Sequence, residues 1–179
     1  MPLQLETERL ILRGYRASDL DAWAAMCADP AVMEFLSPVQ TRGRSKEIAE
    51  RLQTSLDRNG YGWWVVEIKG GAPFAGYVAL QNVPFETTID PPFEVGWRFA
   101  REHWGRGYAS EGGARLLRFA FDELDRPEIV AMTAAINVRS QAVMRRLGMV
   151  HDPAENFDNP RIAVGNCLRP HVLYRKRRG

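Results

Sequence analysis

The segment His103–Gly112, which reads HWGRGYASEG, combines residue types that could hold a phosphate group. Gly105 and Gly107 flank an arginine, and small residues follow before a run with helical periodicity begins. Glycine lets the backbone adopt positive φ angles and approach a ligand without a Cβ in the way. The first amides of a helix are unpaired and the helix dipole is positive at that end, so anions bind there readily. The alternative is an ordinary strand-to-helix turn in which the glycines serve geometry alone.

The spacing of the glycines excludes two common phosphate loops. The P-loop pattern G-x-x-x-x-G-K-[ST] is absent, and no third glycine completes a dinucleotide-binding fingerprint after the first strand. A nucleoside triphosphate site is therefore not expected. The sequence favours a phosphate-bearing ligand that is held mainly by backbone amides.

Strands and helices are expected on both sides of this glycine segment. The predicted strands are Leu10–Arg13, Trp63–Ile68, Phe74–Val83, Phe93–Ala100, Ile129–Ala134, Met149–His151 and His171–Arg175. Four helices are predicted. The first runs from the cap Ser18 to Asp29-Pro30, the second from the cap Ser45 to Asn59-Gly60, the third from the end of the glycine segment to Arg126-Pro127, and the fourth from Ser140 to Gly148. The loop 84–92 is rich in proline and cannot be a central strand. Segment 152–170 is expected to be irregular.

The order strand, helix, strand around the glycine segment implies a parallel pair of strands joined by a right-handed crossover. The strands before it follow one another through short turns, as in the hairpin closed by 69–73. We therefore predict an α+β fold with a mixed central sheet. Its first half is antiparallel, the parallel pair lies at the ligand cleft, and helices cover both faces. Residues 1–179 are expected to form a single domain, because the chain is too short for two comfortable cores.

Composition argues against several classes of protein. The formal net charge is only +2, and the basic run at 175–178 is typical of a solvated end, so nucleic-acid binding is not expected. Cys27 and Cys167 lack metal-site spacing and partners, which predicts neither a disulfide framework nor a metal site. The start MPLQLETERL lacks a signal pattern, and no run approaches the roughly 18 apolar residues of a membrane span. We predict a cytoplasmic protein that does not bind a membrane.

Two longer runs resemble the GNAT superfamily of N-acetyltransferases, in the branch typified by the Rim-type ribosomal-protein acetyltransferases. They are EVGWRFAREHWGRGYASEGGARLL at 94–117 and INVRSQAVMRRLGM at 136–149, and the likeness extends to LETERLILRGYRASDLDAW at 5–23. The resemblance implies acetyl-CoA as co-substrate and no metal. It assigns the pyrophosphate to Gly105, Arg106, Gly107, Tyr108, Ala109 and Ser110. It assigns the pantetheine arm to Trp97, Phe99, Ala100 and Asn137, although Asn137 also suits a turn or cap.

The candidate catalytic residues are Glu94 and Ser140. Glu94 precedes the glycine segment on its strand and is the candidate base, directly or through a water, unless it is solvent-facing or ion-paired. The family often places a tyrosine four residues after Ser140 to protonate the thiolate, but this chain has Met144 there. Ser140 is the candidate substitute, with helix capping as the alternative. His171 is the backup base. A further departure is Trp104, where many members carry a polar side chain.

The resemblance implies transfer of an acetyl group to a primary amine by direct attack within a ternary complex. The acceptor is a protein N-terminus or a small-molecule amine, and the sequence does not choose between them. The alternative is a CoA-binding regulatory module without efficient turnover, which the missing tyrosine favours. Whether the chain forms a homodimer is left open.

Overall fold

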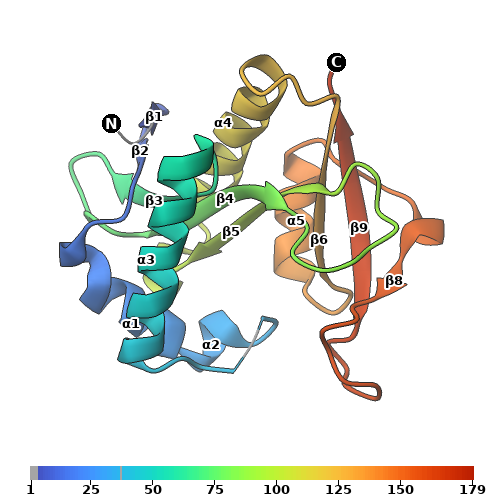
Figure 1. Ribbon diagram of the computed structural model, residues 1–179, viewed down its shortest axis with the longest axis horizontal. Coiled ribbons are helices and arrows are strands. Elements are labelled where there is room, and N and C mark those ends of the chain that lie inside the picture. The colour runs from blue at the N-terminus through green and yellow to red at the C-terminus, as the bar shows by residue number, and fades with distance from the viewer. Residues whose placement is uncertain (1–3, 37) are drawn as a thin grey trace.

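The computed structural model describes residues 4–36 and 38–179 (Figure 1). Residues 1–3, which belong to the predicted single domain and to the start examined for a signal pattern, lie outside the described residues. The strands are β1 Leu5–Glu6, β2 Leu10–Arg13, β3 Trp63–Ile68, β4 Gly76–Asn82, β5 Phe93–Phe99, β6 Glu128–Ala134, β7 Val150–His151, β8 Phe157–Asp158 and β9 Pro170–Arg177. The helices are α1 Leu20–Ala28, α2 Pro30–Met33, α3 Arg42–Asn59, α4 Tyr108–Asp122 and α5 Val138–Arg146. Short 3-10 turns lie at 17–19, 101–103 and 153–155. No helix in the described ranges has the length and apolar character to cross a bilayer.

The sheet has the order β1-β2-β3-β4-β5-β6-β9-β7, and β8 pairs with β9. Strands β1 to β5 are antiparallel to one another, and β5 and β6 form the parallel pair. Figure 1 shows the N-terminal strands on one side of the molecule and β6 and β9 on the other. The predicted mixed sheet is confirmed, and α4 is the crossover between its parallel strands.

Helices cover both faces of the sheet, as predicted. On one face α1 buries Trp23 and Cys27 against Val65 of β3 and Tyr77 of β4. On the other face α4 packs its apolar stripe, with Leu116 at its centre, on the strands, and α5 lies beside it. A fully buried large apolar side chain contributes about 1.5–3 kcal/mol, so these two cores hold the helices to the sheet. Residues from both of these faces line the cavity between β5 and β6.

Several element boundaries differ from the predictions. Asp19, rather than Ser18, organises the start of α1, because its carboxylate accepts a hydrogen bond from the Arg16 amide at 2.7 Å. Helix α3 starts three residues before Ser45, where Thr41 accepts from the Arg44 amide at 3.2 Å. The predicted stop at Asp29-Pro30 is confirmed, because α1 ends at Ala28; the same residues also begin the short helix α2, with Pro30 in the first turn, a position that proline favours.

The ends of two strands also differ from the predictions. Strand β4 begins at Gly76, and a Cβ placed there would lie 2.2 Å from the carbonyl oxygen of Arg98 on β5. Strand β9 runs from Pro170 to Arg177 because it pairs with the whole of β6. The segment 152–170 is mostly irregular, with one 3-10 turn and the short β8. The close approach of β4 and β5 holds together the two strands that line the cavity.

Candidate active site

A cavity of about 750 Å³ lies where β5 and β6 separate. The register joins these two strands at Glu94 and Val130, and β5 then continues to Phe99 with β4 on its other edge. Among the described residues, no strand pairs with the far part of this β5 edge, so its backbone amides and carbonyls are open to a ligand that carries amide groups. The cavity therefore lies at the parallel pair of strands, where the sequence predicts the ligand cleft.

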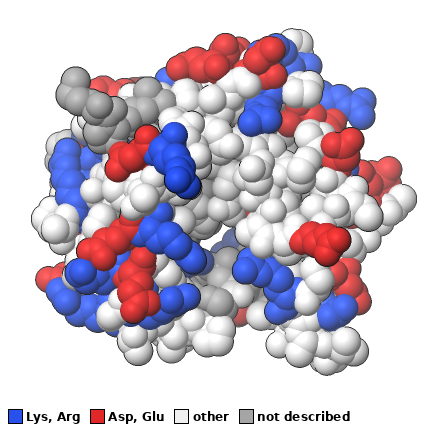
Figure 2. All heavy atoms as spheres, viewed as in Figure 1, with Lys and Arg blue, Asp and Glu red and all other residues white. Residues whose placement is uncertain are grey.

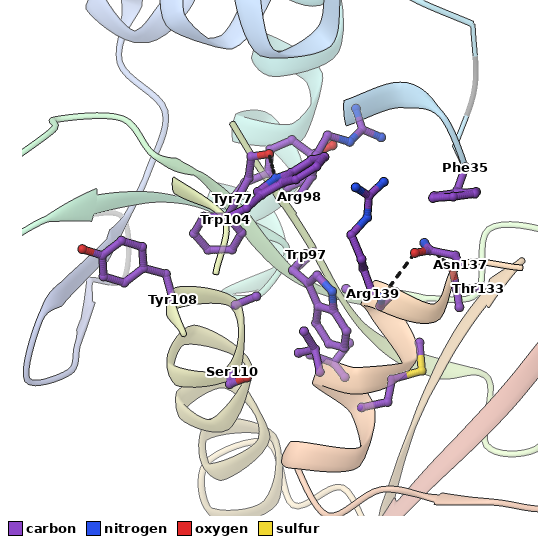
Figure 3. Close-up of a pocket in the computed structure, with 18 of the residues that line it drawn as sticks. Phe35, Tyr77, Trp97, Arg98, Trp104, Tyr108, Ser110, Thr133, Asn137 and Arg139 are labelled. Atoms are coloured by element: carbon purple, nitrogen blue, oxygen red, sulfur yellow. Dashed lines mark hydrogen bonds between the residues drawn. The ribbon is translucent and has the colours of Figure 1, made fainter. Parts of the chain in front are cut away.

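Residues from both faces of the sheet line the cavity. Phe35, Trp63 and Tyr77 line it on the face that α1 and α3 cover, whereas Tyr108 and Met144 line it from α4 and α5. Figure 3 shows Phe35 and Tyr108 on opposite sides of the pocket. In the space-filling view, this side of the molecule is hollowed near its centre, with basic side chains beside the hollow (Figure 2). The two cores on either side of the sheet thus both contribute side chains to one cavity.

The glycine segment forms one end of the cavity. Gly105 and Gly107 have φ values of 72° and 81°, in the left-handed region that favours glycine, and Gly107 is the N-cap of α4. Both glycines line the cavity together with Tyr108, Ala109 and Ser110. The first amides of this long helix have no intrahelical partner, so they are available to an anion. Arg106 is exposed and does not line the cavity.

Ser110 has an unsatisfied hydroxyl in the cavity wall. Its Oγ is buried and, within the described part of the chain, has no hydrogen-bond partner. Leaving a buried polar group unpaired costs about 1–3 kcal/mol. A phosphate oxygen on the α4 amides would satisfy this hydroxyl, so the residues fit the pyrophosphate that the resemblance places here.

Arg9 and Glu111 support the glycine segment from outside the cavity. The Arg9 guanidinium forms an ion pair of 2.6 Å with Glu111, donates to the Arg106 carbonyl at 3.1 Å and stacks on the Tyr108 ring. Although burial acts the other way, hydrogen bonds from Thr7 and Arg9 lower the pKa of Glu111. Arg9 could not be predicted from the sequence, because only the packing of α4 beside β2 brings it to a helix about 100 residues later.

The residues that precede the segment divide into two groups. Trp97 and Phe99 line the cavity, whereas Ala100 is buried and its amide donates to the carbonyl of Ala75 at 3.0 Å. Trp104 lines the cavity and donates through Nε1 to the carbonyl of Phe99 at 2.8 Å. Trp104 thus anchors the end of β5 rather than replacing a polar anion ligand. Ala100 is a candidate cofactor contact that the structure does not bring to the cavity.

Glu94 lies in the cavity wall and is half-buried. Its carboxylate accepts a hydrogen bond of 2.6 Å from Gln81, whose amide oxygen accepts from Trp63 Nε1 at 2.8 Å. Burial raises the pKa of Glu94 to about 7, against the opposing effects of the Gln81 hydrogen bond and the charge of Arg161. Among the described residues no cation forms an ion pair with it, so neither a solvent-facing nor an ion-paired role applies. A carboxylate with a pKa near neutral is well matched to general base catalysis.

Asn137, not Ser140, caps α5. The Asn137 side chain accepts from the Ser140 amide at 3.2 Å and donates to Thr133 Oγ1 at 2.9 Å, and Figure 3 shows Asn137 beside Thr133. The capping alternative for Ser140 is therefore wrong, because the helix starts two residues earlier. Ser140 lines the cavity, and its hydroxyl makes no hydrogen bond with the described residues. Met144 follows it on the cavity wall, and its thioether has no proton to donate.

His171 lies apart from this group. It is buried on β9, where its ring nitrogens are 3.2 Å from Asn159 Nδ2 and 3.1 Å from the Arg169 carbonyl oxygen. Burial lowers the pKa of His171, against opposing backbone hydrogen bonds. It is not among the residues that line the cavity, so the structure does not bring it to Glu94. In residues 4–36 and 38–179, no group of three His, Cys, Asp or Glu side chains could hold a metal ion.

Comparison with known proteins agrees with this geometry. Residues 9–150 match the family model described as an acetyltransferase (GNAT) domain. The FsC-acetyl coenzyme A-N(2)-transacetylase of Aspergillus fumigatus is 39% identical over 106 residues, which are 56% of this chain and 43% of the fungal protein. The chain thus matches less than half the length of that relative.

Solved structures show the same fold. An acetyltransferase of the GNAT family from Bacillus anthracis superposes with a TM-score of 0.80 at 22% identity, over 98% of each chain. RimL, a ribosomal L7/L12 alpha-N-protein acetyltransferase in complex with coenzyme A, superposes with a TM-score of 0.77 at 16% identity, also over 98% of each chain. The resemblance is confirmed by the family model, and a Rim-type enzyme is among the structural neighbours. The co-substrate of this family is acetyl-CoA. The chain therefore belongs to the GNAT family of acetyl-CoA-dependent N-acetyltransferases.

Proposed function

We propose that this protein transfers the acetyl group of acetyl-CoA to a primary amine by direct attack within a ternary complex. The observation that carries the proposal is the cavity itself. One space joins the open edge of β5, the amide end of α4 and the carboxylate of Glu94. Because residues from both faces of the sheet line this space of about 750 Å³, the cofactor and the amine would occupy it together.

The cofactor would enter from the face that α4 and α5 cover. Its pyrophosphate would lie on the amides of Gly107 to Ser110, where the buried Ser110 hydroxyl lacks a partner. Its pantetheine arm would follow the edge of β5 past Trp97 toward Asn137. This path leads the thioester to the point where β5 and β6 meet, beside Glu94.

The reaction balances with the groups that line the cavity. The amine nitrogen attacks the carbonyl carbon of the thioester, a C–N bond forms and the C–S bond breaks. Glu94 takes the proton that the amine loses, directly or through a water. The CoA thiolate takes a proton from Ser140, which regains one from solvent. A thiol of this kind has a pKa near 8.5, so its thiolate is a fair leaving group and tolerates weak acid assistance.

The alternative function is a CoA-binding module without efficient turnover. The observation that favours it is Met144, which stands where the family often has a proton donor. CoA release measured with a thiol reagent against a panel of amines and peptides distinguishes the two functions. The proposal predicts amine-dependent release above solvent hydrolysis. Tight CoA binding by calorimetry with no such release would support the module instead. A cytoplasmic location and a homodimer stay predictions.

A further inference from the structure

The acceptor side of the cavity carries an arginine whose charge is unmatched. Glu94 is the one carboxylate among the lining residues, and the lining arginines are Arg98, Arg139 and Arg146. Arg139 pairs with Glu34 at 2.7 Å, and Arg146 is exposed on α5. Arg98 is half-buried, and no carboxylate in the described part of the chain lies within ion-pair distance of it.

The surroundings of Arg98 leave it without a strong acceptor. Its Nη1 lies 3.7 Å from the Sγ of Cys27, which is a weak acceptor, and its guanidinium stacks on the Tyr77 ring at 5.2 Å. Its Nε is buried and has no hydrogen-bond partner in the described residues. Burying a charge without a partner is costly, so we expect an anion, from the protein or from a ligand, to pair with the Arg98 guanidinium. Nothing in residues 4–36 and 38–179 supplies that anion.

Arg98 and Glu94 belong to one row of side chains. They lie four residues apart on β5 and so project from the same face of the sheet, opposite the face that packs on α4. Gly96 lies between them, and a Cβ added there would meet nothing within 4 Å. The facing residue on β4 is Ala79, with Gln81 opposite Glu94.

These residues form a slot with a small, clear floor and a charged group of opposite sign at each end. Gly96 and Ala79 make the floor, Glu94 lies at the end where the thioester is placed, and Arg98 lies at the other end. Trp63 and Tyr77 also line the cavity on this face. Such a slot suits a linear molecule with a cationic amine at one end and an anion at the other.

We propose that the acceptor is a linear ω-amino carboxylate, whose amine lies at Glu94 and whose carboxylate binds the Arg98 guanidinium. This proposal rests on the proposed function and names its substrate class. Four residues of strand separate the two Cα atoms by about 13 Å. After a hydrogen bond at each end, about 7 Å remains, which is spanned by a chain of about five methylene groups. The bond that forms and the bond that breaks are those of the proposed acetyl transfer.

The test compares ω-amino acids of increasing chain length with alkylamines of the same length, in the CoA-release assay. A charge-assisted hydrogen-bonded pair contributes about 1.5–3 kcal/mol, so we expect a preference of about 10–100-fold in kcat/KM for the amino acid of matching length. Arg98→Gln should remove this preference, so that the ratio of kcat/KM for the amino acid to kcat/KM for the alkylamine of the same length falls to about 1. Arg98→Lys should restore part of it. The matched control is Arg101→Gln, which removes an exposed arginine that does not line the cavity.

Each other outcome overturns a defined part of the account. Equal rates for amino acids and alkylamines, or a raised acetyl-CoA KM in Arg98→Gln with the preference intact, would overturn the Arg98 assignment. If short peptides with an acidic second residue are acetylated faster than any ω-amino acid, the acceptor is a peptide N-terminus and the proposed small-molecule acceptor is wrong. If no amine releases CoA, the proposed function fails. Arg98-dependent binding of the ω-amino acid to the CoA-bound protein, measured by calorimetry, would then still support the slot.

Gly96→Val gives an independent variant. A side chain at this position meets open space in the protein, so folding should be preserved while the slot is narrowed. We expect at least about 10-fold lower kcat/KM for long ω-amino acids, because the added methyl groups occupy the volume of the acceptor chain. Unchanged turnover of these acceptors by a folded Gly96→Val protein would show that they do not cross the floor of the slot.

Discussion

Replacing Glu94 by glutamine removes the candidate base while keeping its shape. The amide oxygen of a glutamine can still accept the hydrogen bond from Gln81 that Glu94 accepts at 2.6 Å. General base catalysis typically contributes about 10²–10⁴-fold, so kcat should fall by that factor while the affinity for acetyl-CoA is retained. The base must be ionised to act, so the wild-type rate should rise with pH through about 7, the pKa of Glu94. The variant should lose this rise.

The same substitution should stabilise the protein at alkaline pH. Burial raises the pKa of Glu94 from 4.5 to about 7, so the folded state holds a proton that the unfolded state has lost. Each unit is worth about 1.4 kcal/mol, which gives about 3 kcal/mol before solvent access to the half-buried carboxylate reduces it. Wild-type stability is therefore lost as pH rises from 4.5 to about 7. Glu94→Gln should be more stable by about 2 kcal/mol above that range and equal below it.

Urea unfolding on both sides of this pH range, together with the pH dependence of kcat/KM, checks both expectations. Glu86→Gln is the matched control, since Glu86 is an exposed carboxylate of the loop 84–92 that does not line the cavity. It should change neither the rate nor the pH profile. If Glu94→Gln keeps the wild-type rate and the wild-type pH profile, Glu94 is not the base. If its stability does not depend on pH relative to the wild type, burial does not perturb this carboxylate.

Three further substitutions test other parts of the structure. In the folded Gly107→Val protein, the acetyl-CoA KM should rise at least about 10-fold. Gly70→Val, also at positive φ but in an exposed turn, should leave this KM unchanged. Equal KM values for the two variants would show that the amides at the start of α4 do not hold the cofactor. Ser110→Ala should weaken acetyl-CoA binding measured by calorimetry while leaving the stability of the unliganded protein equal or higher, because the hydroxyl has no partner without a ligand. Asp19→Ala should cost about 1–3 kcal/mol in urea unfolding, because it removes the 2.8 Å ion pair from the buried Arg13 guanidinium, which keeps its 2.6 Å ion pair with Glu67; a loss below about 0.5 kcal/mol would contradict that pairing.

The order of elements could be predicted because their signals are local. The apolar stripe that follows Gly107 and the apolar runs on either side of it were enough to predict the parallel pair that α4 connects. Helix starts were harder, since several residues at each one could serve as the cap. At α5 both Asn137 and Ser140 were suitable, and the choice depends on the contact of Asn137 with Thr133 of β6. No local signal reports such a contact.

The glycine segment and Glu94 could be predicted as site residues, but their properties could not. The raised pKa of Glu94 arises from its burial, against the hydrogen bond from Gln81, and the extent of that burial depends on packing that one sequence does not report. Arg98 lies within the motif, but a half-buried arginine without a carboxylate partner is recognisable only in three dimensions. The same reason explains His171, whose side chain turns out to pair with Asn159 away from the cavity.

The most direct test of the central claim follows the acetyl group itself. Acetyl-CoA labelled in its acetyl group is incubated with the protein, with and without an amine that supports CoA release, and the label is traced in protein, amine and solvent fractions. Direct transfer in a ternary complex predicts label in the amine in equal amount to the CoA released, and no label covalently attached to the denatured protein when the amine is absent. Covalent label on the protein without the amine, or amine-dependent CoA release without labelled amine, would contradict the account.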